Sequence, residues 1–95
     1  MDSFQVILTK HAIEDLGKIP KELRDQILKD LKNSESAPWP SGTSVKRLKG
    51  FRPPVYRFRS GDFRVLYQID GDRVTILRII VRKLLERVIK RLKIR

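Results

Sequence analysis

The chain of 95 residues contains no cysteine and a single histidine, His11. Without cysteine there is no disulfide framework and no thiol nucleophile, and one histidine cannot complete a Cys/His zinc site. We therefore expect neither a metal nor a cofactor. Any chemistry has to use arginine, lysine, tyrosine, aspartate, glutamate or His11.

The sequence also lacks long hydrophobic runs. No uncharged apolar stretch approaches the roughly 20 residues that a membrane-spanning helix needs. The first eight residues show no basic leader followed by a long apolar core. We expect a cytoplasmic protein with no membrane partner. Its length leaves room for one domain, over residues 1–95, with one modest core.

Positive charge is what the chain has in excess. There are 22 lysines and arginines against 11 aspartates and glutamates, which gives a formal net charge of +11. Such an excess favours a polyanionic partner, most often nucleic acid. An anionic membrane or an acidic protein satisfies the same charge, so charge alone does not identify the partner.

The segment 55–69 alternates apolar and basic residues on both sides of Gly61-Asp62, which predicts a β-hairpin. If the loop consists of these two residues, the basic and the apolar side chains lie on opposite faces. The basic face then carries Arg57, Arg59 and Arg64, and the apolar face carries Tyr56, Phe58, Phe63, Val65 and Tyr67. Three guanidinium groups on one small sheet repel each other unless an anion lies across them. We place the function here.

Before the hairpin, apolar spacing predicts a strand over residues 4–8, a short helix, and a second helix with an apolar stripe of Leu23, Ile27, Leu28 and Leu31. Thr9 is positioned to cap the first helix, Gly17 to end it, and Pro20 to begin the second. A loop rich in serine, proline and glycine follows around Trp39, which we expect to be a packing anchor.

After the hairpin, the sequence Asp70-Gly71-Asp72 predicts a second turn, and residues 74–81 a strongly apolar strand. A three-residue loop places Thr75, Leu77, Ile79 and Val81 on the core face, and Arg78, Ile80 and Arg82 beside Arg64 on the basic face. A two-residue loop reverses these assignments. We favour three residues because Arg78 then stays out of the core. Residues 84–92 predict an amphipathic helix.

A cationic face of this kind has two possible uses. It can simply bind phosphate, or it can stabilise the charge that develops when a 2′-hydroxyl group cleaves a phosphodiester. Arginine is a poor general base, since its pKa lies above about 12. We expect His11 to be a solvated helix residue, Tyr56 and Tyr67 to pack in the core, and Asp62 to support its turn rather than a metal.

The chain resembles the RelE/ParE superfamily of type II toxins, most closely its RelE branch. The likeness runs nearly end to end and is carried by the segments 16–20, 45–50, 56–67 and 74–82. It implies an α+β fold in which two N-terminal helices pack on a small twisted antiparallel sheet, followed by a C-terminal amphipathic helix. It also implies an mRNA interferase that enters the ribosomal A site, cleaves the bound codon through 2′-hydroxyl attack and is held inactive by a cognate RelB-like antitoxin, with operator DNA contacted through the antitoxin complex.

Four arginines match the positions that act in cleavage in this family. Arg57 and Arg59 match the basic strand positions at the scissile nucleotide, Arg64 matches the arginine that holds phosphate after the turn, and Arg82 matches the arginine that ends the last strand. The cations expected to bind RNA around them are Lys46, Arg47, Lys49 and Arg78.

The sequence departs from many relatives after the last strand. No histidine or tyrosine follows Asp72, and the place of the family's C-terminal tyrosine falls at Glu86. Glu86 could act as a base there, but we favour a solvated glutamate paired with Lys83 or Lys90. Two alternatives stay open: a ParE-like toxin that binds DNA gyrase, and an inactive homologue that only binds its antitoxin.

Overall fold

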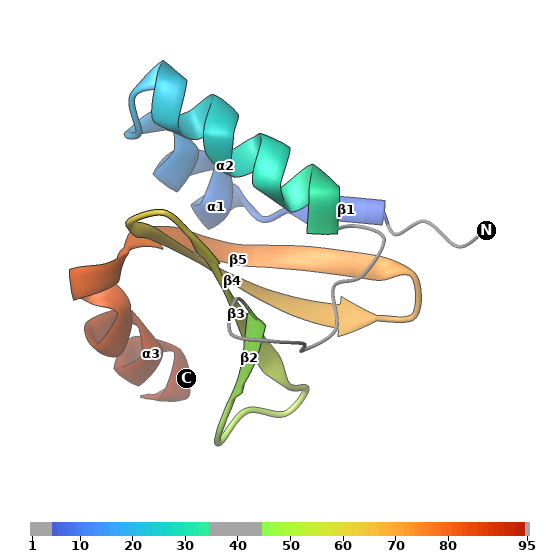
Figure 1. Ribbon diagram of the computed structural model, residues 1–95. Coiled ribbons are helices and arrows are strands. Elements are labelled where there is room, and N and C mark those ends of the chain that lie inside the picture. Colours follow the sequence, from blue (N-terminus) through green and yellow to red (C-terminus); the bar gives the residue numbers. More distant parts are fainter. Residues whose placement is uncertain (1–4, 35–44, 95) are drawn as a thin grey trace.

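Five strands form one sheet, with helices on both of its faces (Figure 1). The computed structural model describes residues 5–34 and 45–94, so Trp39 and most of the loop around it lie outside the described residues. The elements are β1 (Gln5–Leu8), α1 (Lys10–Gly17), α2 (Lys21–Ser34), β2 (Val45–Leu48), β3 (Val55–Ser60), β4 (Phe63–Asp70), β5 (Arg73–Val81), the 3-10 turn η1 (Arg82–Leu84) and α3 (Leu85–Ile94). No helix in the described ranges is long and apolar enough to cross a membrane.

The strand order is β1-β5-β4-β3-β2, and the predicted α+β fold is confirmed. Strands β2 to β5 pair antiparallel, as expected, but β1 pairs parallel with β5. The sheet is therefore mixed rather than wholly antiparallel. Apolar alternation over residues 4–8 predicts that a strand forms, but it holds no information about the direction of the neighbouring strand.

Each face of the sheet has its own apolar cluster. Helices α1 and α2 cover one face, and α3 covers part of the other (Figure 1). The larger cluster, under α1 and α2, includes Tyr56, Val65, Tyr67, Ile76 and Ile79. The smaller cluster, under α3, is built from Val55, Leu66, Ile80 and Val88. The face that carries the hairpin arginines is thus basic near the β3–β4 turn and apolar farther along the strands.

The local signals for the helices act as expected. The Thr9 side chain accepts a hydrogen bond from the Ala12 backbone N–H at 3.2 Å, which caps α1. Pro20 directly precedes α2. The predicted apolar stripe of α2 is only partly buried: Ile27 lies in the core, whereas Leu23 stays 49% exposed.

The second turn differs from the prediction. Asp70 pairs with Arg73, so the loop holds the two residues Gly71 and Asp72. The first half of β5 consequently has reversed parity, with Val74 and Ile76 rather than Thr75 and Leu77 in the larger cluster.

A β-bulge then restores the predicted parity. Tyr67 pairs with Ile76 and Leu66 with Arg78, which leaves Leu77 without a partner on β4. One extra residue in a strand exchanges the faces of everything that follows it. Ile79 therefore lies in the larger cluster, and Ile80 pairs with Arg64 as expected.

Helix α1 holds the bulge at both of its ends. The Thr9 hydroxyl lies 2.8 Å from the Ile76 carbonyl oxygen and 3.2 Å from that of Leu77. At the other end, one oxygen of Asp15 accepts the Ile79 backbone N–H at 2.9 Å and the Arg78 Nε at 2.8 Å. A second guanidinium nitrogen of Arg78 lies 3.1 Å from the other oxygen. Thr9 and Asp15, at the two ends of α1, thereby bond the backbone groups on the edge of β5 beyond the end of β1.

The Asp15 contact gives a stability prediction. The Asp15→Ala variant should lower the free energy of unfolding by about 3 kcal/mol, because it leaves the largely buried Arg78 guanidinium and the Ile79 N–H unpaired. The matched control is Asp25→Ala, which removes the carboxylate of an exposed Lys21–Asp25 pair and should change stability by no more than about 0.5 kcal/mol. Urea unfolding measures both, and equal effects of the two substitutions would contradict the role given to Asp15.

Candidate functional site

The register of β3 and β4 confirms the two-residue hairpin loop. Arg59 lies directly opposite Arg64, and Arg57 lies opposite Leu66. On the neighbouring edge strand, Lys46 pairs with Arg57. Because side chains alternate along a strand, these four cations share the face of Leu66, at the end of the sheet nearest the turn.

Arg64 is the buried member of the group, with only 5% of its surface exposed. One terminal guanidinium nitrogen donates to the carbonyl oxygens of Gly61, at 3.0 Å, and Phe63, at 2.9 Å. The Arg64 side chain therefore stabilises the turn through these two hydrogen bonds. Its Nε atom is buried and has no hydrogen-bond partner in the described part of the chain. A buried donor without a partner is costly, and an incoming acceptor would relieve that cost.

The charges of three other arginines act on the Arg64 guanidinium. Burial lowers the pKa of the Arg64 guanidinium, and the charges of Arg57, Arg82 and Arg59 lower that pKa further, in this order. The carboxylate of Asp62 acts in the opposite direction. The four arginines expected to act together are thus brought together, in a field that favours an anion.

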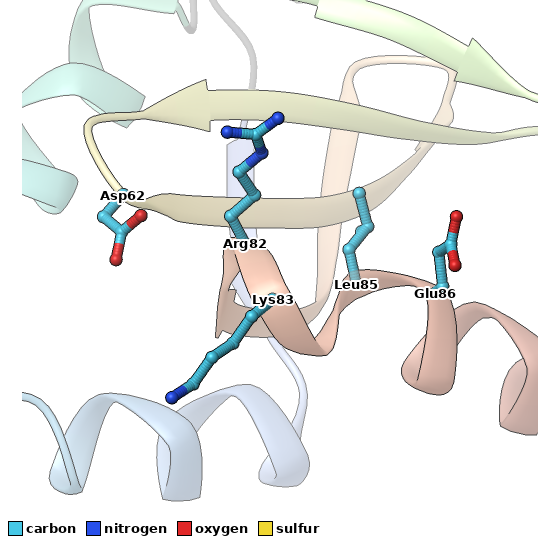
Figure 2. A pocket seen from close by; sticks show the side chains of 5 residues that line it. All are labelled: Asp62, Arg82, Lys83, Leu85 and Glu86. Atoms are coloured by element: carbon cyan, nitrogen blue, oxygen red, sulfur yellow. The ribbon is translucent and has the colours of Figure 1, made fainter.

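The end of β5 joins the hairpin at its turn. The backbone N–H of Arg82 donates to the Asp62 carbonyl oxygen at 2.8 Å. Beside this contact lies a cavity of about 530 Å³, lined by Asp62, Arg82, Lys83, Leu85 and Glu86. In Figure 2 the Arg82 and Glu86 side chains project from the same side of this segment, with Leu85 between them, whereas Lys83 projects the opposite way.

Glu86 does not make the ion pair that we favoured. Among the described residues, neither Lys83 nor Lys90 forms a salt bridge with it. Glu86 belongs to the first turn of α3 and is exposed at the cavity. Its carboxylate therefore lies at the cavity that Arg82 also lines, without an ion pair to any described residue.

Helix α2 supports the hairpin from the other face. The Ser60 hydroxyl donates to one oxygen of Asp30 at 2.6 Å, and the Gln26 amide donates to the other oxygen at 2.9 Å. Ser60 directly follows Arg59 and is 4% exposed. No local sequence pattern predicts this contact, because Ser60 and Asp30 lie 30 positions apart and neither belongs to a motif.

Several predicted residues lie away from the arginine group. Arg78 was expected on the basic face, and its guanidinium is paired with the Asp15 carboxylate. Its contact with RNA stays a prediction. Arg47 pairs with Tyr56 and has the parity of the opposite face. Lys49 lies in the turn after β2, at the end of the sheet distant from the hairpin loop.

The other titratable candidates are structural or distant. Tyr56 and Tyr67 stack with ring centroids 5.7 Å apart inside the larger cluster, as predicted. Burial raises the pKa of the Tyr67 hydroxyl, and Tyr56 raises it further. His11 is exposed on α1, across the sheet from α3. Over residues 5–34 and 45–94, no three histidine, aspartate or glutamate side chains gather in a way that could hold a metal ion.

Comparison with known proteins identifies the family. The model of the ParE toxin of type II toxin-antitoxin systems matches residues 6–84, which is most of the chain. The chain belongs to the RelE/ParE toxin family. A curated relative, toxin RelE3 of Methanocaldococcus jannaschii, is 28% identical over 82 residues, covering 83% of this chain and 91% of that protein.

Solved structures of toxins in this family share the fold. The RelBE2 toxin-antitoxin complex of Mycobacterium tuberculosis matches with a TM-score of 0.73 and 26% identity, covering 84% of this chain and 99% of the matched chain. The RelE-RelB complex of Pyrococcus horikoshii OT3 matches with a TM-score of 0.70 and 27% identity, covering 84% and 96%. The family model carries the ParE name and these relatives carry the RelE name.

Repulsion within the arginine group gives the second prediction. The Arg59→Gln variant should raise the free energy of unfolding by up to about 1 kcal/mol at low salt, because it removes a like charge directly opposite Arg64. In about 1 M salt the gain should vanish, since the Debye length falls to about 3 Å.

The matched control is Arg73→Gln, because Arg73 is also an exposed strand arginine but lies opposite Asp70. It should not stabilise the protein at any salt concentration. Urea unfolding at two ionic strengths measures the difference. A salt-independent gain in Arg59→Gln would contradict the repulsion.

Proposed function

We propose that this protein is the toxin of a type II toxin-antitoxin system and a ribosome-dependent endoribonuclease that cleaves mRNA in the A site. The observation that carries the proposal is the group of three arginines, Arg57, Arg59 and Arg82, whose charges act on the buried guanidinium of Arg64, which has an unpartnered nitrogen. Such a group is suited to a phosphodiester, whose oxygens gain charge during cleavage. Action on mRNA would take place in the cytoplasm.

The reaction in this proposal is attack by the 2′-hydroxyl group on the adjacent phosphorus. The guanidinium groups of Arg57, Arg59 and Arg82 stabilise the charge on the phosphoryl oxygens and on the leaving 5′-oxygen. Arg64 fixes the turn through one terminal nitrogen and offers its unpartnered Nε–H group to the same phosphate. Lys46 lies beside Arg57 and extends the RNA-binding face, and Arg47 and Lys49 stay candidates for contacts farther along the RNA.

The proposed protein partners follow from the relatives. The similar toxins of Mycobacterium tuberculosis and Pyrococcus horikoshii were solved in complex with antitoxins. We propose that a RelB-like antitoxin neutralises this protein and that the complex contacts operator DNA through the antitoxin. The net charge of +11 is suited to the ribosome and its mRNA as the target of the free toxin.

Primer extension on a defined mRNA, held on purified ribosomes, tests the proposal. The wild-type protein should cut at the A-site codon, and Arg82→Gln should cut about 100-fold to 1,000-fold more slowly, because it removes a donor to the developing charge. Arg82 is preferable to Arg64 as the test position, because the Arg64 side chain also holds the turn.

The control is Arg73→Gln, at the opposite end of β5, which removes the same charge and should cut at the wild-type rate. Equal losses in both variants would mean that only net charge matters. Intact mRNA with the wild-type protein would refute the endoribonuclease.

The second candidate function is a gyrase-binding toxin, favoured by the match to the ParE family model. A DNA supercoiling assay with purified gyrase separates the two candidates. The proposed endoribonuclease should leave supercoiling unchanged at concentrations that cut ribosome-bound mRNA. Inhibition of supercoiling without cleavage would assign the chain to the gyrase-binding toxins.

A further inference from the structure

The endoribonuclease proposed above needs a group that takes the proton from the attacking 2′-hydroxyl, and the arginine group cannot supply it. Arginine keeps its proton at physiological pH and offers donors only. Lys83, which also lines the cavity, is a cation as well. The proton acceptor must therefore be a different side chain that reaches the same space.

The neutral candidates are excluded by position. Tyr56 and Tyr67 are buried in the larger cluster, beneath the helices that cover the opposite face. His11 lies on α1, also on that opposite face. Two carboxylates remain at the cavity, those of Asp62 and Glu86.

These two carboxylates differ in their surroundings. Asp62 belongs to the hairpin loop, its charge acts on Arg64, and in Figure 2 its carboxylate is directed away from the side on which Arg82 projects. Glu86 projects on the same side as Arg82 and has no ion pair within the described residues. An ionised carboxylate is acceptor-only, which is the property that the arginine group lacks.

We propose that Glu86 is the general base of the cleavage reaction. The proposal rests on the proposed endoribonuclease function. The Glu86 carboxylate takes the proton of the 2′-hydroxyl, and the freed electron pair of that oxygen forms the bond to phosphorus. The bond from phosphorus to the 5′-oxygen breaks, and the leaving oxygen keeps its electron pair and takes a proton from water. The products are a 2′,3′-cyclic phosphate and a 5′-hydroxyl end.

The placement of Glu86 explains how α3 serves the site. Helix α3 is fixed to the sheet by Leu85 and Val88, which pack in the smaller cluster with Leu66 and Ile80. Glu86 lies between these two anchors, so its backbone has a defined position relative to Arg82. A base on a packed helix is held more firmly than one on a free loop.

Single-turnover cleavage of ribosome-bound mRNA as a function of pH tests the assignment. For the wild-type protein the rate should fall at acidic pH, where a carboxylate takes up its proton. The Glu86→Gln variant should cut at least about 100-fold more slowly at neutral pH, and its remaining rate should lack the acidic decline. Binding of an RNA with a 2′-O-methyl group at the scissile nucleotide should be retained, which shows that the variant is folded.

The matched control is Glu22→Gln, because Glu22 occupies the first turn of α2 as Glu86 occupies the first turn of α3. This control should keep both the rate and the acidic decline. Wild-type cleavage with a full rate in Glu86→Gln would overturn the proposal, as would a slow variant that keeps the acidic decline. An Asp62→Asn variant that loses the decline in place of Glu86→Gln would overturn it too. Absence of wild-type cleavage is a separate outcome that refutes the proposed function itself.

Discussion

The bulge at Leu77 is the constraint on which the arginine site depends. After the two-residue turn, the even-numbered residues of β5 face α1 and α2, whereas beside the β3–β4 turn the even-numbered residues face the arginine side of the sheet. One unpaired residue makes that change, because side chains alternate strictly along a strand. Without it, Ile80 and Arg82 would face the helices α1 and α2. Thr9 and Asp15, at the two ends of α1, bind the backbone on either side of the bulge and so fix its place.

The register of the hairpin places like charges opposite each other. Arg59 faces Arg64 across the hairpin, and Arg57 and Arg82 add to the same field. The fold tolerates this repulsion because the apolar clusters and the contact of Ser60 with Asp30 hold the hairpin from below. Strain of this kind is usual where a ligand completes a site. Helix α3 covers the apolar end of the same face and places Glu86 at the cavity that Arg82 also lines.

The sequence predicted the hairpin and its two faces, because a Gly-Asp loop between alternating strands leaves few other registers. It also predicted the N-cap of α1, the end of α1 at Gly17, the start of α2 and the amphipathic α3. It failed where the structure depends on contacts between distant residues. The bulge is one such feature. The predicted three-residue loop, chosen to keep Arg78 out of the core, assigned Ile79 and Ile80 to the correct faces. It assigned Thr75 and Leu77 to the wrong face, because the bulge lies after Thr75 and at Leu77.

The sequence also did not predict which charged side chains are paired or buried. Arg78 looked like a surface cation, and its partner Asp15 lies 63 positions away on a helix. Arg64 was placed correctly by register, but its burial depends on the turn carbonyls that it reaches from beneath. The direction of β1 follows from its place beside β5, which no local pattern encodes.

We propose that the arginine group, with the unpartnered nitrogen of Arg64 at its centre, binds the RNA phosphodiester. This can be tested by nuclear magnetic resonance of the arginine Nε–H groups during titration with a short RNA blocked by 2′-O-methyl groups. The Arg64 signal should shift downfield and exchange more slowly with water, and the signals of Arg57, Arg59 and Arg82 should shift with it. An unchanged Arg64 signal, with shifts only at residues outside this group, would contradict it.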